Sequence, residues 1–194
     1  MGEIALELKF QKCRIIVEFS FPAVLACLFL QSDSEILKQS FFVCLIHELG
    51  HGIVMTLTGA GIREIRFYAA GIRMTANTCL LSTFQMLAVY FSGPLINLLC
   101  GVCFWKYQPV TAILHLSMGI FNLLPYRILD GGAALESLFE TRSDFLQIRS
   151  RFCILLSICV IFLLHFYKIL SPALFLMVLY LAFCEISVDK SRSL

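Results

Sequence analysis

The sequence has few charged residues: Asp, Glu, Lys and Arg make up 14% of its 194 residues, whereas 59% are hydrophobic. Soluble domains carry about 25% charged residues. The mean hydropathy is +0.87, so the chain has more apolar side chains than one soluble core can bury. This composition excludes a large soluble catalytic domain and indicates a membrane protein. Each helical span takes about 20 largely apolar residues, which leaves little chain outside the bilayer.

The sequence also lacks an excess of charge of one sign. Fifteen Lys and Arg residues are balanced by 13 Asp and Glu residues, and the formal net charge is +2. The basic residues are scattered in short clusters and form no broad basic surface. We therefore exclude nucleic acid as a partner.

Cysteine is plentiful, but its pattern is not that of a disulfide scaffold. The nine cysteines are odd in number, and most lie inside apolar runs, where a free cysteine behaves as a small hydrophobic residue. Cys100 and Cys103 form a C-x-x-C pair, a spacing that elsewhere binds metal or exchanges disulfides. No polar neighbour is present to activate them, so packing is the favoured interpretation.

Six apolar runs, separated by polar or glycine-bearing connections, predict six membrane-spanning helices in one domain of residues 1–194. The first run follows basic residues, as a signal peptide would. Glu18 interrupts it and no cleavage site follows, so we expect it to be retained. The predicted spans are residues 15–30, 41–58, 80–105, 110–124, 152–166 and 170–186.

Positive charge is distributed unequally between the connections. Twelve Lys and Arg residues fall in the N-terminal segment, the second and fourth loops and the C-terminus, and three fall in the remaining loops. Cytoplasmic loops carry the excess of Lys and Arg. The count predicts a multi-pass protein with both termini in the cytoplasm, and we expect a bacterial cell membrane as its location.

Two connections have patterns of their own. In residues 62–75, apolar residues alternate with charged ones around Gly71, which predicts a short β-hairpin at the membrane surface. Residues 134–140 have helical spacing and predict an interfacial helix. The predicted fold is thus an all-α polytopic membrane protein with a small membrane-associated hairpin after the second span.

The second predicted span contains the motif His47-Glu48-Leu49-Gly50-His51, an H-E-x-x-H sequence. On a helix, residues i and i+4 lie one above the other, so both imidazoles can reach one metal ion. Glu48 is rotated by about 100° from His47 and can address a water at an open coordination position. Ionisable groups inside a membrane span cost several kcal/mol unless they have partners, which favours a metal site over two core histidines.

A catalytic zinc site needs a third protein ligand, and Asp130 is the best candidate. The other three aspartates lie in polar flanking sequence, whereas Asp130 follows the fourth span and Pro125, just before two glycines. The alternative interpretation is an ordinary helix cap. Spans two and four both run from outside to inside in the predicted topology, so the three ligands would meet near the cytoplasmic face.

The third predicted span has a polar stripe of Ser82, Gln85, Ser92, Gly93 and Asn97. Hydrolysis within a bilayer needs a wetted cavity, which such a stripe could line, although small residues also mediate helix packing. The amide of Asn97 can hold a substrate carbonyl or position an oxyanion, so we assign it to substrate binding. His115 and His165 lie in no motif and are interpreted as structural or interfacial.

Three motifs in this order resemble those of the site-2 protease family of intramembrane zinc metalloproteases. They are His47-Glu48-Leu49-Gly50-His51, Gly93-Pro94-Leu95-Ile96-Asn97, and Asn122-Leu123-Leu124-Pro125 leading to Asp130-Gly131. The resemblance implies a catalytic core over about residues 41–132, with one zinc ion held by His47, His51 and Asp130. It also implies catalysis by Glu48 and substrate contact by Asn97.

Among the branches of that family, the chain looks most like the six-span sporulation type, which cleaves a membrane-tethered pro-sigma factor. That branch usually carries a CBS domain after the last span, and other branches insert a PDZ domain; we expect neither in this chain. The implied partners are a membrane-bound protein substrate, the lipid bilayer and membrane-protein regulators of the protease.

The sequence therefore predicts a metalloendopeptidase that hydrolyses a peptide bond in or near a transmembrane segment. The alternative is a non-proteolytic membrane metal-binding protein, either a carrier or a scaffold. A carrier needs ligands along a path through several spans, whereas the candidate ligands here cluster at one end. An inactive relative of the protease is disfavoured because Glu48 and all three candidate ligands are present.

Overall fold

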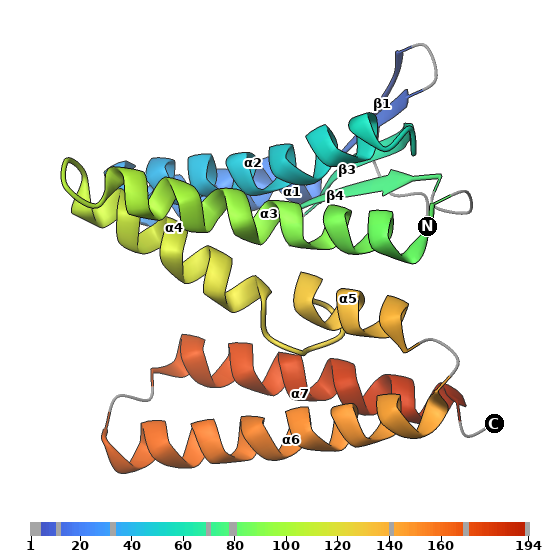
Figure 1. Ribbon diagram of the computed structural model, residues 1–194. Coiled ribbons are helices and arrows are strands. Elements are labelled where there is room, and N and C mark those ends of the chain that lie inside the picture. Colours follow the sequence, from blue (N-terminus) through green and yellow to red (C-terminus); the bar gives the residue numbers. More distant parts are fainter. Residues whose placement is uncertain are drawn as a thin grey trace. The chain divides into compact units, whose positions relative to one another are not determined.

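The computed structural model describes residues 5–10, 13–31, 34–68, 71–77, 81–139, 142–168 and 171–192. The chain forms two compact units, Met1–Phe121 and Asn122–Leu194. Within the described residues, the first unit contains a four-stranded sheet and four helices, and the second contains three helices (Figure 1).

The helices of the first unit are built around a central pair. Among the described residues, the two longest helices of this unit lie side by side (Figure 1). The longer one ends where Gly59 adopts a positive φ of 74°, a left-handed conformation that glycine tolerates at a helix C-terminus. The four helices are α1 (Ser20–Gln31), α2 (Ser34–Leu57), α3 (Thr83–Phe104) and α4 (Pro109–Asn122).

The sheet has the strand order β1-β2-β3-β4. The outer pairs are antiparallel hairpins, whereas β2 pairs with β3 in parallel, and α1 and α2 form the crossover between them. This pairing joins a strand that precedes α1 to a strand that follows α2. The strands are β1 (Ala5–Phe10), β2 (Cys13–Glu18), β3 (Ile62–Tyr68) and β4 (Gly71–Ala76).

The sheet confirms one sequence prediction and corrects another. The predicted hairpin of residues 62–75 is present as β3 and β4. The prediction that the first helix begins at Ile15 was wrong, because residues Cys13–Glu18 form β2 and the helix begins at Ser20. The run Ile15-Ile16-Val17 is β-branched, which suits a strand, and its pairing with β1 and β3 is a long-range contact that a count of apolar residues misses. The fold is therefore mostly helical but not all-α.

The second unit contains α5 (Asp130–Leu138), α6 (Ser143–Phe166) and α7 (Pro172–Arg192). The last two pack against each other. The predicted interfacial helix of residues 134–140 is present as α5, but it begins four residues earlier, at Asp130. Residue 140 lies outside the described residues.

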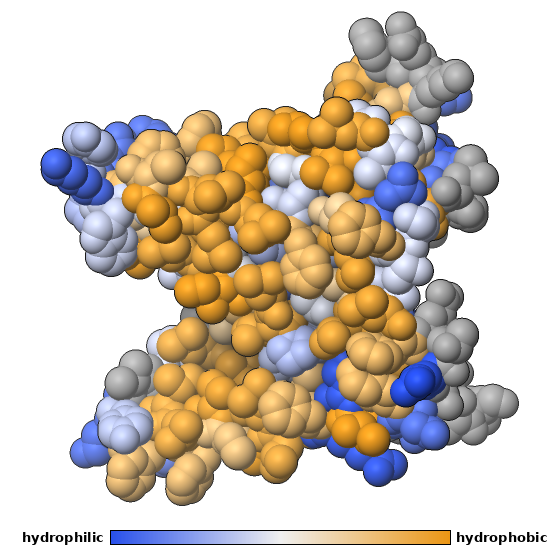
Figure 2. Space-filling view, viewed as in Figure 1, coloured by the Kyte–Doolittle hydropathy of each residue, from blue (hydrophilic) through white to orange (hydrophobic). Residues whose placement is uncertain are grey.

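Three helical segments in the described part of the chain are long and apolar enough to cross a membrane: Glu35–Leu57, Thr83–Phe104 and Asp144–Phe166. Two shorter apolar helices, Pro109–Asn122 and Leu174–Ile186, coincide with two further predicted spans. Apolar side chains cover much of the helical surface, as Figure 2 shows for one face. The count of six spans stays a prediction; Leu80 and Leu170, where two of the spans were expected to begin, lie outside the described residues.

Candidate metal centre

The H-E-x-x-H motif lies in the second half of α2, and its two histidines point the same way. Their side chains are buried, and the Nε2 atoms of His47 and His51 lie 3.2 Å apart. Two nitrogen ligands of a tetrahedral zinc ion, each about 2.0–2.1 Å from the metal, are separated by about 3.3 Å. The two imidazoles are therefore arranged as ligands of one ion would be.

The second ring nitrogen of each histidine has its own partner on α3. Nδ1 of His51 lies 2.7 Å from the carbonyl oxygen of Val89, an acceptor that confines the ring proton to Nδ1 and leaves the Nε2 lone pair available for a metal. Nδ1 of His47 lies 3.2 Å from the side-chain nitrogen of Asn97. The Val89 carbonyl orients the His51 ring as the acceptor partners of metal-bound histidines do in zinc sites. The Asn97 amide holds the His47 ring from α3.

Gly93 on α3 makes room for the two rings. A Cβ atom at this position would lie 2.7 Å from Cε1 of His51 and 2.9 Å from Cε1 of His47. Real Cβ atoms do not approach other atoms so closely. Only glycine lets α3 pack against the imidazoles in this way.

Asn97 is fully buried and bridges two histidines. Its amide nitrogen faces His47, and its oxygen lies 3.2 Å from Nδ1 of His115 on α4. His115 is also fully buried, and its ring stacks on Phe104. The sequence analysis selected Asn97 but gave His115 no functional role, because nothing in the sequence around His115 marks it.

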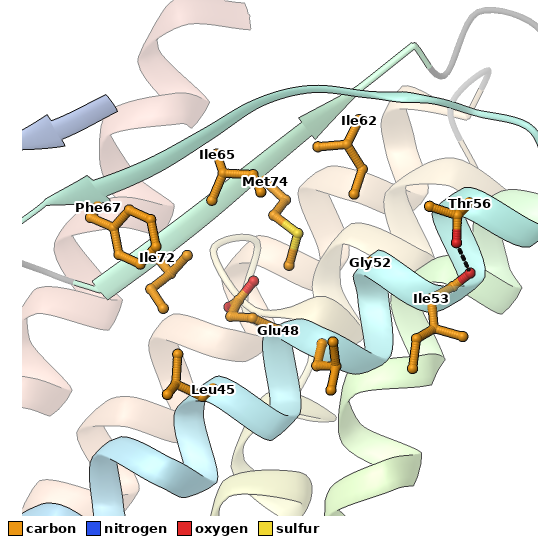
Figure 3. Close-up of a pocket in the computed structure, with 11 residues that line it drawn as sticks. Leu45, Glu48, Gly52, Ile53, Thr56, Ile62, Ile65, Phe67, Ile72 and Met74 are labelled. Atoms are coloured by element: carbon orange, nitrogen blue, oxygen red, sulfur yellow. Dashed lines mark hydrogen bonds between the residues drawn. The ribbon is translucent and has the colours of Figure 1, made fainter. Parts of the chain in front are cut away.

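Glu48 lies on a different face of α2, toward the hairpin. Its side chain points from the helix toward β3 and β4, into an apolar groove of about 410 Å³ (Figure 3). The groove separates α2 from the inner face of the hairpin. Besides Glu48, its lining residues are Leu45, Leu49, Gly52, Ile53, Thr56, Ile62, Ile65, Phe67, Ile72 and Met74.

In the second unit, Asp130 is the first residue of α5. A carboxylate is favoured there because the helix N-terminus carries partial positive charge. Leu129, the N-cap residue, makes no side-chain capping bond. The next two residues are Gly131 and Gly132, where a Cβ would collide with the backbone of the preceding turn. The paired glycines let that turn fold directly onto the start of α5.

The turn before α5 is held by a buried ion pair that the sequence analysis did not single out. The carboxylate of Glu185 on α7 accepts a hydrogen bond of 2.6 Å from the backbone N–H of Arg127. It also accepts one of 2.7 Å from Ser150 and lies 3.5 Å from a guanidinium nitrogen of Arg149. Arg149 in turn donates to the carbonyl oxygen of Gly132. An ionisable residue within the apolar run of residues 170–186 was the signal available for Glu185.

The polar stripe of the third predicted span divides into two parts. Ser92 lies near His51, with Oγ 3.4 Å from Nδ1, and Gly93 and Asn97 contact the histidines as described above. Ser82 and Gln85 instead form a reciprocal capping box at the start of α3. The hydrogen-bonding groups of Ser82 and Gln85 therefore cap the N-terminus of α3.

The comparisons with known proteins agree on one family. The family model "Peptidase M50B-like" matches residues 21–129, which is more than half of the chain, and "Peptidase family M50" matches residues 102–166. Among solved structures, the chain is similar to the site-2 protease from Methanocaldococcus jannaschii, with a TM-score of 0.65. The identity is 22%, and the match covers 95% of this chain and 94% of that one. No curated protein matches this chain.

The chain belongs to the M50 peptidases, the site-2 protease family. Members of this family are integral membrane metalloproteases, and their metal is typically zinc. The donor atoms of this chain fit that metal, because His47, His51 and Asp130 each offer one nitrogen or carboxylate oxygen of the kind that zinc binds.

Proposed function

We propose that this protein is an intramembrane zinc metalloprotease that hydrolyses a peptide bond in or near a transmembrane segment of a membrane-bound protein. The observation that carries the proposal is the geometry on α2. The two Nε2 atoms converge to 3.2 Å, and Glu48, between the two histidines in sequence, points into an apolar groove. Metal donors, a proton acceptor and a cavity for an apolar peptide are therefore combined in one turn of helix.

Three ligands are proposed for one zinc ion: His47, His51 and Asp130. The convergent imidazoles support the first two. The chemistry of the carboxylate and its place in the third family motif support Asp130. We expect Asp130→Asn to lower zinc content, whereas Asp144→Asn, an exposed position at the start of α6, serves as the matched control.

Zinc, when bound, supplies a Lewis acid that lowers the pKa of water and polarises the scissile carbonyl. Glu48 acts as the general base. Its carboxylate takes a proton from the attacking water and transfers that proton to the leaving amine nitrogen, so the carboxylate is regenerated at the end of each turnover.

The groove and the hairpin are proposed to bind the substrate in extended form. A transmembrane helix hides its peptide bonds in its own hydrogen bonds, so it has to unwind before hydrolysis. Strand β4 is at one edge of the described sheet, and an edge strand can pair with an added strand. The apolar groove between α2 and the hairpin then accepts side chains of the unwound segment.

The test uses the full chain in proteoliposomes with a candidate tethered substrate, and compares wild type with Glu48→Gln. We expect cleavage by wild type, a rate at least about 100-fold lower in the variant because the general base is lost, and equal zinc content in both. Wild-type cleavage by Glu48→Gln would contradict the assignment. Zinc transport into vesicles that survives Glu48→Gln but not His47→Ala would support the carrier alternative instead.

The substrate class follows from the resemblance rather than from the groove. A tethered transcription factor or pro-sigma factor, cleaved in regulated intramembrane proteolysis during sporulation, is the proposed natural substrate. The proposed location is a bacterial cell membrane, which follows from the resemblance to the sporulation branch. The excess of positive charge in alternate loops supports an orientation with both termini in the cytoplasm.

A further inference from the structure

The buried side chains of Asn97 and His115 form a chain of contacts that ends on a proposed metal ligand. Nδ1 of His47, the amide of Asn97 and Nδ1 of His115 follow one another with two separations of 3.2 Å. They come from α2, α3 and α4. Asn97 and His115 are both fully buried, so water does not compete for these hydrogen bonds.

The role of Asn97 follows from the tautomer that His47 needs. A histidine that binds a metal through Nε2 keeps its proton on Nδ1 and must donate it. The neighbour of that Nδ1 therefore has to present an acceptor. Of the two ends of the Asn97 amide, only the oxygen can accept.

His115 decides which end of the amide faces His47. The two ends are nearly equal in shape, and a 180° rotation exchanges them without moving another atom. A neutral His115 that accepts at Nδ1 binds the NH₂ end and turns the oxygen toward His47. A neutral His115 that donates at Nδ1 does the reverse, and this is the arrangement in the structure, where the amide nitrogen faces His47 and the oxygen faces His115. Zinc binding through Nε2 of His47 therefore requires the amide to rotate by 180°. The tautomer of His115 and that of His47 are thus linked through one amide.

We propose that Asn97 and His115 are positioning residues for zinc: together they confine the proton of His47 to Nδ1 and so keep its Nε2 lone pair available. This inference rests on the proposed function, because it assumes His47 as a ligand. It assigns the buried amide of Asn97 to the ligand and not to the substrate. His115 acts only through Asn97.

The experiment measures zinc affinity of the full chain in detergent by competition with a chromophoric chelator, together with thermal unfolding. Asn97→Leu removes both hydrogen bonds at similar size, and we expect zinc to bind about 10- to 100-fold more weakly, the usual cost of losing the partner of a ligand histidine. Asn97→Asp should retain wild-type affinity or exceed it, because both carboxylate oxygens accept. His165→Phe, at an exposed histidine of α6, is the control and should bind zinc as wild type does.

A double-variant cycle separates positioning from packing. His115→Phe should weaken zinc binding severalfold when residue 97 is Asn, and by less than about twofold in the Asn97→Asp background, where no end of the side chain has to be chosen. A packing defect would cost the same in both backgrounds. The ¹⁵N spectrum of His47 in the zinc-loaded chain should show the proton on Nδ1 in wild type.

The outcomes that overturn the inference differ from those that overturn the function. If wild type binds no zinc, the proposed function fails and this inference fails with it. If wild type binds zinc and Asn97→Leu binds it equally well, the inference alone is wrong. Equal losses from His115→Phe in both backgrounds would also overturn the part assigned to His115.

Discussion

The backbone of Gly93 lies directly against the imidazole of His51, leaving no space for a side chain on α3 at this point. A Cβ atom there would stand 2.7 Å from Cε1 of His51. Because of this close approach, the apolar helix α3 packs directly against the two histidines of α2.

Gly93→Ala should therefore weaken zinc binding. The added methyl group overlaps both imidazoles, and overpacking of this kind costs about 1–3 kcal/mol, equivalent to about 5- to 150-fold in affinity. Competition with a chromophoric chelator measures the zinc affinity of the variant. Gly52→Ala, on the same helix as the histidines, is the matched control. A Cβ there meets Met74 at 3.5 Å, an ordinary contact, so its zinc affinity should equal that of wild type.

Loss of Glu185 should destabilise the second unit. Glu185→Leu leaves the buried guanidinium of Arg149 without its carboxylate, which costs about 3–5 kcal/mol when one partner of a buried pair is removed. Thermal or denaturant unfolding in detergent measures the change. The double variant Glu185→Leu with Arg149→Met should lose less than the sum of the two single changes, and simple additivity would show that the pair is not coupled.

The carboxyl group of Glu64, on β3, should titrate below its ordinary pKa of 4.5. A hydrogen bond from Arg66 is the main cause that lowers this pKa, and Arg14 adds a second. Because the folded pKa is lower than the unfolded one, the contribution to sheet stability is complete near neutral pH. It is lost as the pH falls through the folded pKa. ¹³C NMR titration measures the midpoint, and Arg66→Gln should raise it; an unchanged midpoint would contradict the assignment.

Polar substitution in the groove should impair peptide cleavage without affecting the metal. Ile72→Asn places an amide among the apolar residues that face Glu48, and we expect a 10- to 100-fold lower kcat/KM, from about 1–3 kcal/mol of lost apolar contact. Zinc content should not change. Thr75→Asn is the control, since Thr75 is on the same strand, exposed and outside the groove. Equal effects of the two changes would argue against the groove as the substrate site.

Much of the helical part of the fold could be read from local patterns. Long apolar runs and the alternating residues 62–75 were sufficient to predict the main helices and one hairpin, because these elements depend on neighbours close in sequence. The start of the first helix was not predictable in this way. Residues 15–17 are apolar enough for a span, and only pairing with β1 and β3 makes them a strand.

The sequence by itself determined the chemistry of the candidate site: H-E-x-x-H spacing brings two imidazoles to one side of a helix and turns Glu48 elsewhere, since 3.6 residues make one turn. Only the tertiary structure decided what surrounds these groups. Three contacts join residues that are far apart in sequence. Gly93 packs against the histidines, Asn97 lies between His47 and His115, and Glu185 binds the turn before α5. Such contacts depend on how helices pack, and packing leaves no local periodic signal.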